Sequence, residues 1–412
     1  MKIETACRAC GAEELEVVLS LGSLPLANSL LYESDLAKPE PTYPLDFAFC
    51  PRCALAQITA TVDPEVLFAG EYVYLSSFSD TALANAKEIA ERMQAELGLG
   101  VAHRVVELAS NDGYLLQHYL ALGVPVLGIE PAENAAEVAR ERHGIECLNT
   151  FFSEELAAEL AAEGPIADVV HANNVLAHVA DLRGFVRGIR TILRPAGRAV
   201  LEVPYLGELI ERLEFDTIYH EHLCYFSLTA LQGLFEREGL TLLDVEQIPI
   251  HGGSLRVFVG HEGGPSARVG ELLRAEREHG LHSLERFADL GARVADLRVR
   301  LLAFMDELKA SGQRVAAYGA AAKGATLLCY AGLGRETFDY VVDRSSVKQG
   351  RLMPGSHLPI EAPERLLEDQ PDCVLLLAWN FAEEIAAQQA EYLRRGGRFV
   401  VPVPEPHFLE TD

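Results

Sequence analysis

The sequence predicts an α/β protein with a parallel-sheet central domain, a second, smaller α/β domain at the C-terminus and a small N-terminal module. Two observations predict the sheets: short apolar runs alternate with amphipathic stretches from residue 104, and the alternation restarts after a charged helical stretch at 266–310. A third observation, two Cys-x-x-Cys pairs near the start of the chain, marks off the N-terminal module. We therefore expect domains at 1–75, 76–250 and 251–412.

The elements of the central domain are expected to begin with an amphipathic helix at 80–97. Apolar runs then predict strands at 105–108, 126–129, 168–170 and 199–201, with helices near 114–122, 132–143, 153–163 and 181–193. Two strands near 240–260 close this domain, and the C-terminal domain has predicted strands at 314–318, 373–377 and 398–401. Strands that alternate with helices over short connections form a parallel sheet covered on both faces.

The composition limits the classes of partner. Hydrophobic residues make up 49% of the 412 residues, so sizeable cores can form. Against 35 basic residues stand 61 acidic ones, giving a net charge of −26, which argues against nucleic-acid and membrane partners. Since the N-terminus is polar and no apolar run approaches the roughly 18 residues of a spanning helix, we expect a cytoplasmic protein.

The cysteine pairs predict a metal site. Cys7 and Cys10 form one Cys-x-x-Cys pair, and Cys50 and Cys53 form the other. Each pair turns two sulfur atoms toward one point, and four thiolates complete the tetrahedral shell that zinc prefers. Two redox-active pairs or a chance spacing are the alternatives. Because four cysteine ligands leave no open coordination position, we expect a structural zinc ion.

The first strand of the central domain leads through a tight loop into a helix, and the next strand ends in an acidic residue. An acid at that place can accept both hydroxyl groups of an adenosyl ribose. The loop has one glycine where a dinucleotide pyrophosphate needs several, so S-adenosylmethionine is favoured over NAD. A turn without any ligand is the alternative. The residues expected to hold the cofactor here are Glu107, Ala109, Asn111, Gly113, Tyr114 and Glu130.

Two further groups extend the expected cofactor site. Asn173 and Asn174 follow the strand at 168–170, at the carboxyl edge where open α/β sheets bind ligands. Phe151 and Phe152 precede the helix at 153–163 and are expected to flank an adenine ring. Packing in the core is the alternative for these aromatic residues.

The segment Tyr219-His220-Glu221-His222 is the densest polar and aromatic stretch of the chain. So many titratable groups are costly in a core, so we expect the segment to line a cleft. In an extended segment alternate residues share a face, which groups Tyr219 with Glu221 and His220 with His222. A metal-binding His-x-His with His178 as third ligand, and a solvated loop, are the alternatives. His178 by itself is either a packing residue or a part of the site.

Taken together, these motifs resemble those of the deoxysugar C-methyltransferases of antibiotic biosynthesis. The resemblance covers essentially the whole chain, with a C-terminal part that begins near His251. The motifs that carry it are the four cysteines, Glu71-Tyr72-Val73-Tyr74-Leu75-Ser76-Ser77, Ser110-Asn111-Asp112-Gly113-Tyr114 and Tyr219-His220-Glu221-His222. It implies a class I methyltransferase (Rossmann-like) central domain, a zinc-binding N-terminal domain, and S-adenosylmethionine-dependent methylation of dTDP-linked 4-keto-sugars.

The resemblance also implies roles for the cluster around residue 220. His222 is expected to be the base, with Tyr219, Glu221 and His178 in the same pocket. Methylation of a carbon next to a ketone requires removal of a proton from that carbon, which gives an enolate whose charge must be stabilised. His222 would take the proton, Tyr219 or His178 would donate a hydrogen bond to the enolate oxygen, and Glu221 would orient a partner or the sugar.

A dTDP-sugar is anionic, so local cations must oppose the acidic surface of this protein. Lys323 stands at a strand–helix junction, where the free amides of a helix N-terminus add to its charge. Arg344 and Lys348 are further candidates, and a solvated surface position is the alternative for Lys323. One wall of the sugar site is expected to consist of Tyr72, Tyr74, Ser76 and Ser77, with hinge packing as the alternative for Tyr74.

Three other functions are compatible with the sequence: O- or N-methylation of another small molecule, a non-catalytic nucleotide-sugar-binding module, and a nicotinamide dehydrogenase. For the assembly we expect a monomer or a small homo-oligomer.

Overall fold

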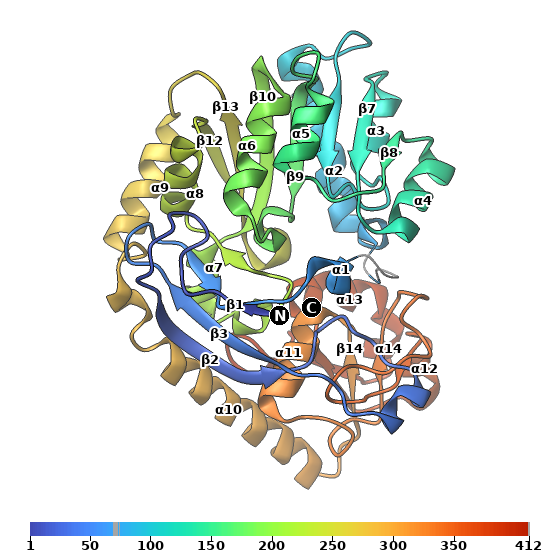
Figure 1. Ribbon diagram of the computed structural model, residues 1–412. Coiled ribbons are helices and arrows are strands. Elements are labelled where there is room, and N and C mark those ends of the chain that lie inside the picture. The colour runs from blue at the N-terminus through green and yellow to red at the C-terminus, as the bar shows by residue number, and fades with distance from the viewer. Residues whose placement is uncertain (69–72, 74, 411–412) are drawn as a thin grey trace.

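The computed structural model describes residues 1–68, 73 and 75–410. Two α/β domains lie one above the other, and the strands of the N-terminal module (residues 1–68) lie beside both of them (Figure 1). Among the described residues, none of the helices is long and apolar enough to cross a membrane.

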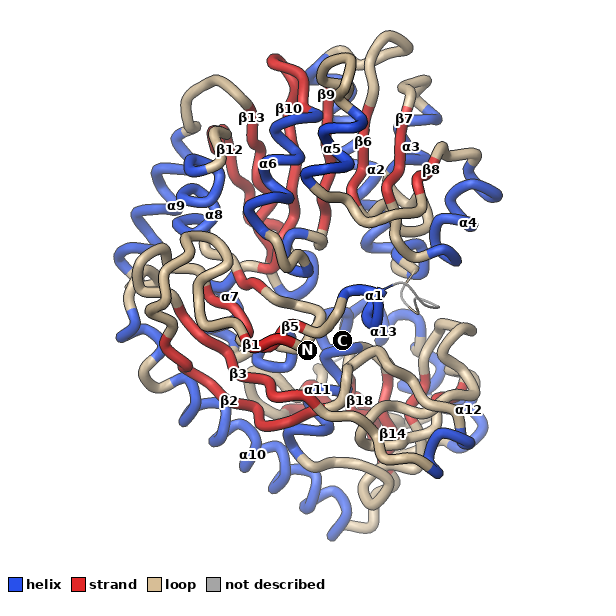
Figure 2. The backbone as a smooth tube through the Cα atoms, in the orientation of Figure 1, coloured by secondary structure: helices blue, strands red, loops and turns tan. Residues whose placement is uncertain are grey.

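The central domain contains a seven-stranded sheet with helices on both faces (Figure 2). The strands in spatial order are β12 (Thr241–Ile248), β13 (Ser254–Gly260), β10 (Leu193–Pro204), β9 (Ala167–Asn173), β6 (Val105–Leu108), β7 (Val126–Ile129) and β8 (Cys147–Leu148). Strands β10, β9, β6, β7 and β8 are parallel, whereas β13 is antiparallel to both of its neighbours. The sheet therefore runs past residue 250, where the sequence predicts a domain boundary, to Gly260.

Polar caps start several helices of the central domain. Ser79, Ser153, Asp181 and Ser227 each accept a hydrogen bond from the backbone amide three residues ahead, which satisfies one of the free amides of the first turn. The helices are α2 (Asp80–Leu97), α3 (Leu116–Ala121), α4 (Glu133–His143), α5 (Glu154–Leu160), α6 (Leu182–Ile192), α7 (Leu206–Arg212) and α8 (Leu228–Arg237). The caps at Ser153 and Asp181 mark where the loops after β8 and β9 end.

The C-terminal domain repeats the architecture on a smaller scale. Its strands in spatial order are β16 (Ile360–Glu361), β15 (Val341–Val342), β14 (Val315–Tyr318), β17 (Cys373–Leu376), β18 (Arg398–Val401) and β19 (His407–Phe408). The first five are parallel and β19 is antiparallel. Its helices are α11 (Ala322–Ala331), α12 (Arg365–Asp369), α13 (Ala382–Gln388) and α14 (Ala390–Arg394), and α9 (Ala267–Glu278) and α10 (Leu290–Ala310) connect the two domains.

The N-terminal module is joined to the central domain through a shared sheet. Its elements are β1 (Lys2–Ile3), β2 (Glu16–Leu24), β3 (Tyr43–Phe49), β4 (Ala56–Ile58), β5 (Ala60–Thr61) and α1 (Pro64–Phe68). Strands β2, β3 and β4 form an antiparallel sheet whose fourth strand is β11 (Cys224–Tyr225) of the central domain. Strand β11 follows directly after the predicted catalytic segment, so that segment lies where the module and the central domain meet.

Candidate active site and zinc centre

The four predicted zinc ligands come together in the N-terminal module. Their sulfur atoms all lie within 4.8 Å of one another, with Sγ–Sγ distances of 3.4 Å for Cys7 and Cys53 and 3.6 Å for Cys10 and Cys50. Zinc–sulfur bonds of about 2.3 Å in a tetrahedron separate the sulfur atoms by roughly 3.8 Å, so the four thiols fit a zinc ion. Within the described residues no other histidine, cysteine, aspartate or glutamate group has this kind of arrangement.

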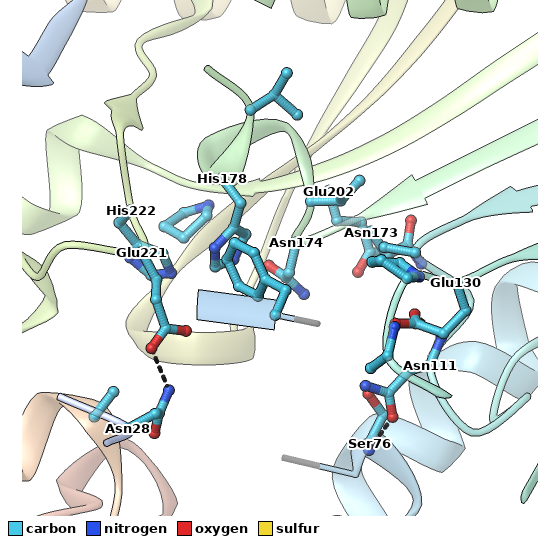
Figure 3. A pocket seen from close by; sticks show the side chains of 18 of the residues that line it. Asn28, Ser76, Asn111, Glu130, Asn173, Asn174, His178, Glu202, Glu221 and His222 are labelled. Carbon is cyan, nitrogen blue, oxygen red and sulfur yellow. Dashed lines mark hydrogen bonds between the residues drawn. The ribbon is translucent and has the colours of Figure 1, made fainter. Parts of the chain in front are cut away.

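A cavity of about 490 Å³ lies where the N-terminal module and the two α/β domains meet. All three parts contribute to its wall, and Figure 3 shows labelled side chains from opposite sides of it. We call the part around the carboxyl edge of the central sheet, where the sequence predicts the methyl donor, the donor half; it contains Ala109, Asn111, Tyr114, Glu130, Phe151, Phe152, Asn173, Asn174 and Glu202. We call the part where the sequence predicts the sugar the acceptor half; it contains Asn28, Phe68, His178, Tyr219, Glu221, His222, Lys323 and Lys348.

The loop after β6 is shaped by residues in the left-handed region. Ala109, Asn111 and Gly113 have φ values of 54°, 50° and 81°. A side chain at Gly113 would collide with Ile145, which explains the single glycine. The Glu130 carboxylate accepts hydrogen bonds from the amides of Asn111 and Ala132, both at 2.8 Å, and burial raises the pKa of Glu130 to about 7.

The asparagines at the end of β9 present polar atoms to the cavity. Asn173 is 8% exposed, and neither its amide nitrogen nor its amide oxygen has a hydrogen-bond partner among the described residues. Buried amides are nearly always paired, so this side chain is free to bind a ligand. Asn174 has a φ of 55°, and its buried amide oxygen has no hydrogen-bond partner in the described part of the chain.

The remaining predicted cofactor residues divide into two groups. Tyr114 lies in the cavity wall, and Phe152 packs edge-on against Phe185 there, with ring centroids 5.2 Å apart. Glu107 and Gly113 lie outside the wall. Glu107 is buried behind the loop, and burial together with the nearby acids Glu130, Asp112 and Glu202 raises its pKa well above the usual range.

The predicted base is held in a defined orientation. The Nδ1 atom of His222 lies 3.0 Å from the carbonyl oxygen of Thr217, which only accepts hydrogen bonds. Nδ1 therefore carries a hydrogen, and in the neutral ring Nε2 has the lone pair. Nε2 lies 2.8 Å from the Tyr219 hydroxyl, which donates to it, and the two rings are 4.1 Å apart.

Residues 219–222 form a turn, closed by a hydrogen bond of 2.9 Å from the His222 amide to the Tyr219 carbonyl. The expectation of an extended segment with His220 and His222 on one face is therefore wrong. The turn brings Tyr219 against His222 and directs His220 toward the N-terminal module, where its Nε2 lies 3.2 Å from the Tyr43 carbonyl. The two histidines do not converge on a common point, as a His-x-His metal site would require.

Three other side chains of the acceptor half are His178, Glu221 and Asn28. The His178 ring lies 4.8 Å from the His222 ring and 5.5 Å from the Phe68 ring, and burial lowers the pKa of His178 to about 4, so it is neutral at pH 7. Glu221 is buried and accepts a hydrogen bond of 2.7 Å from the Asn28 side chain. Burial raises the pKa of Glu221 to about 7, against the opposing effects of the Asn28 hydrogen bond and the Lys348 charge.

The predicted cations occupy different surroundings. Lys323 lies partly buried in the cavity wall, where its ammonium donates to Asn380 at 2.8 Å and lies 4.3 Å from the Trp379 ring centre. Burial lowers the pKa of Lys323, although the Asp216 and Glu214 carboxylates oppose that shift. Lys348 donates to the Ala320 carbonyl at 2.8 Å and also lines the cavity.

Some predicted substrate residues lie away from the cavity. Arg344 is absent from the wall and forms ion pairs with Glu384 at 3.6 Å and with Asp80 at 4.0 Å. Ser76 lines the cavity and donates its amide to the Asn111 side chain at 2.9 Å, whereas Ser77 donates its amide to Asp112 outside the wall. Tyr72 and Tyr74 lie outside the described residues.

Three known protein families match the three parts of the chain in order. A putative zinc binding domain matches residues 7–68, a methyltransferase domain matches 77–245, and a C-methyltransferase C-terminal domain matches 249–404. The C-methyltransferase NovU of Streptomyces niveus is 38% identical over 411 residues, which cover 98% of this chain and 97% of that protein. The chain belongs to the C-methyltransferase family. The family resemblance drawn from the motifs is thereby confirmed.

Other proteins are similar to only part of this C-methyltransferase. A ubiquinone biosynthesis O-methyltransferase of Bartonella bacilliformis is 26% identical over 132 residues, or 31% of this chain and 53% of that protein. Among solved structures, the 1,6-didemethyltoxoflavin-N1-methyltransferase of Burkholderia thailandensis is 20% identical, with a TM-score of 0.35, and the match covers 44% of this chain and 79% of that chain.

The cofactors of this C-methyltransferase are S-adenosylmethionine and zinc, as the sequence predicts. The residues present fit both. The four converging thiols suit a zinc ion, and in the donor half of the cavity Asn173 has a buried amide that no other described residue pairs with. When bound, S-adenosylmethionine supplies an electrophilic methyl group.

Sequence reasoning missed several residues of the cavity wall. Asn28 reaches Glu221 from the segment after β2, which contains no motif, and only the fold brings the two together. Glu202 and Asn85 also line the cavity, and Glu202 forms a buried ion pair of 2.8 Å with Arg256. The position of Glu202, an acid within the apolar strand β10, is a signal that could have pointed to it.

Proposed function

We propose that this C-methyltransferase transfers a methyl group to the carbon next to the ketone of a dTDP-linked 4-keto-deoxysugar. One observation carries the proposal: a single cavity connects the Asn111–Glu130 edge of the sheet with the Tyr219–His222 pair. A methyl donor at the first and a carbon acid at the second would meet within this cavity, as in-line transfer requires.

In this proposal His222 is the base that removes the proton from the carbon. The Thr217 carbonyl holds Nδ1 in its protonated form, so Nε2 is the basic atom, and it can accept a proton when Tyr219 donates elsewhere. The same carbonyl continues to accept from Nδ1 after the ring has become positively charged. The base is thus oriented before and after the proton moves.

The enolate oxygen needs a hydrogen-bond donor, and two neutral donors are available beside the base. The Tyr219 hydroxyl lies 2.8 Å from the basic nitrogen, so it can turn from His222 toward a ketone oxygen as the charge develops. His178 is neutral and lies against the His222 ring. Either donor would stabilise the negative charge of an enolate.

The C-terminal side of the cavity suits the anionic nucleotide. Lys323 and Lys348 both lie in its wall, together with Ala321 and Ala322 at the start of the ten-residue helix α11. A helix N-terminus offers free amides to phosphate oxygens, and the two lysines add positive charge. These groups would oppose the net charge of −26 at the one place where the substrate requires it.

The experiment combines the protein with a panel of dTDP-4-keto-sugars. With S-adenosylmethionine we expect one sugar to gain a single methylene unit by mass, and in D₂O without the donor we expect its α-proton to exchange. His222→Ala should slow both reactions by about 100-fold or more, whereas Tyr219→Phe should slow them less. If no sugar of the panel is methylated or exchanged, the proposal is wrong.

A further inference from the structure

The N-terminal module is hydrogen-bonded directly to the catalytic turn. Strand β11 follows that turn and pairs with β4, with Cys224 opposite Gln57 and Tyr225 opposite Ala56. The Ile58 amide extends this pairing by donating to the Leu223 carbonyl at 3.0 Å. Strand β4 starts three residues after Cys53, so a single sheet connects the zinc ligands with the catalytic turn.

His220 has no part in the proposed proton removal. It is 1% exposed, and its Nε2 lies 3.2 Å from the Tyr43 carbonyl and 3.3 Å from the Pro44 carbonyl. Since both partners only accept, Nε2 carries the hydrogen. Tyr43 and Pro44 begin β3, which ends next to Cys50, so the ring ties the turn to a second strand of the module.

Asn28 ties a third segment of the module to the turn. Its amide nitrogen donates to the Glu221 carboxylate at 2.7 Å, which Figure 3 shows as a dashed line across the lower part of the cavity. The segment that carries Asn28 is itself held by the C-terminal domain, because Leu31 and Leu352 exchange backbone hydrogen bonds of 3.0 and 2.8 Å. The segment that brings Asn28 to Glu221 is therefore anchored to the C-terminal domain.

We propose that the zinc-bound N-terminal module is a working part of the active site, in which Asn28 and His220 are positioning residues for the Tyr219–His222 turn. The inference rests on the proposed function, because it takes that turn as the place of proton removal. The four cysteine ligands fix the ends of β3 and β4, and these strands fix β11 and the His220 ring. A shift of about 1 Å at a reacting group can cost roughly 100-fold in rate, so even a small displacement of the turn would slow proton removal.

The test compares Asn28→Ala, His220→Ala and His220→Gln with a control, Ser20→Ala, in the full chain. Ser20 makes an exposed hydrogen bond of 2.6 Å to Asp46 in the same module, far along the chain from the turn. Four quantities are measured: α-proton exchange in the active keto-sugar, affinity for S-adenosylhomocysteine, zinc content, and backbone hydrogen–deuterium exchange of the peptide 217–226.

We expect Asn28→Ala and His220→Ala to slow α-proton exchange by about tenfold to 100-fold, with zinc content and S-adenosylhomocysteine affinity unchanged. Deuterium uptake of peptide 217–226 should rise in both, and removal of zinc from the wild-type protein should raise it further. His220→Gln should recover much of the loss, since its amide can donate to the same carbonyls. Ser20→Ala should behave as wild type.

Two results overturn the inference. One is α-proton exchange at the wild-type rate in both Asn28→Ala and His220→Ala, and the other is unchanged deuterium uptake of peptide 217–226 after zinc removal. If the wild-type protein exchanges no sugar proton, the proposed function fails, and the deuterium uptake of the peptide still decides whether the module supports the turn.

Discussion

The sheets of the central and C-terminal domains share a strand order, and in both an acidic residue follows the corresponding strand. The order β8-β7-β6-β9-β10 of the central sheet corresponds to β16-β15-β14-β17-β18 of the C-terminal sheet. Glu130 follows β7, and Asp343 follows β15. Each carboxylate accepts two backbone hydrogen bonds. One comes from the loop after the first strand, from the amide of Asn111 or Ala320, and the other comes from the amide two residues after the acid itself.

The two acids differ in what faces them. Glu130 lies in the cavity wall and has only backbone amides as partners in the described structure, so its charge is available to a ligand. Asp343 has the Lys348 ammonium 3.6 Å away, and it is that lysine which reaches the cavity. The same architecture thus presents a hydrogen-bond acceptor on one side and a positive charge on the other, as the proposed contacts with ribose and phosphate require.

Exchanging the two acids for amides should separate these roles most strongly. Glu130→Gln removes the charged acceptor proposed for the ribose, and we expect the affinity for S-adenosylhomocysteine to fall by about 100- to 1000-fold. Asp343→Asn should change it by less than about threefold, because that acid serves its own domain. Titration calorimetry of both variants checks this. Equal losses in the two variants would contradict the comparison.

The pairing of Lys348 with Asp343 should matter for stability. Their side chains are 9% and 14% exposed, so Lys348→Met leaves a largely buried carboxylate without its counter-charge. We expect a loss of about 3 kcal/mol in the free energy of unfolding, most of which Asp343→Asn should restore in the double variant. Trp379, the single tryptophan, lies in the C-terminal domain and reports its unfolding in urea by fluorescence. If the two substitutions lower the free energy of unfolding additively, the Lys348–Asp343 pair does not contribute to stability.

The residue that follows the first strand gives a smaller contrast. Ala109 and Gly319 occupy this position in the two domains, with φ values of 54° and 94°. A Cβ at Gly319 would lie 2.7 Å from the Cβ of Ala378, so Gly319→Ala should cost about 2 kcal/mol. Ala109→Gly should change stability by less than about 1 kcal/mol, because it relieves strain but adds freedom to the unfolded chain. Thermal unfolding of both variants measures the difference.

Local sequence signals predicted the parts of the molecule that depend on neighbours in the chain. The strands expected at 105–108 and 126–129 coincide with β6 and β7, since buried parallel strands are continuous apolar runs. The cysteine pairs were equally informative, because their spacing already contains the geometry of the zinc ligands.

Contacts between distant segments were not predictable in this way. The pairing of β11 with β4 and the hydrogen bond between Asn28 and Glu221 join residues more than 160 positions apart, and no local pattern encodes them. The turn at 219–222 was missed for a related reason, since alternation describes an extended chain and a turn breaks it. Arg344 shows that charge near a sheet edge does not decide which way a side chain points, because nearby acids hold it outside the cavity.

The pH dependence of ligand affinity is the smallest of the expected effects. It tests directly whether the Glu130 carboxylate is available to a ligand. Burial raises the pKa of Glu130 to about 7, and in the proposed binding mode the ribose hydroxyls donate to the ionised form, so proton and ligand compete. Affinity for S-adenosylhomocysteine should therefore fall by roughly tenfold between pH 8 and pH 6 and reach a plateau at higher pH. Glu130→Gln should abolish this dependence. Glu221→Gln should retain the pH dependence, because Glu221 lies in the acceptor half. If this variant loses the pH dependence, Glu221 and not Glu130 is the group responsible for it.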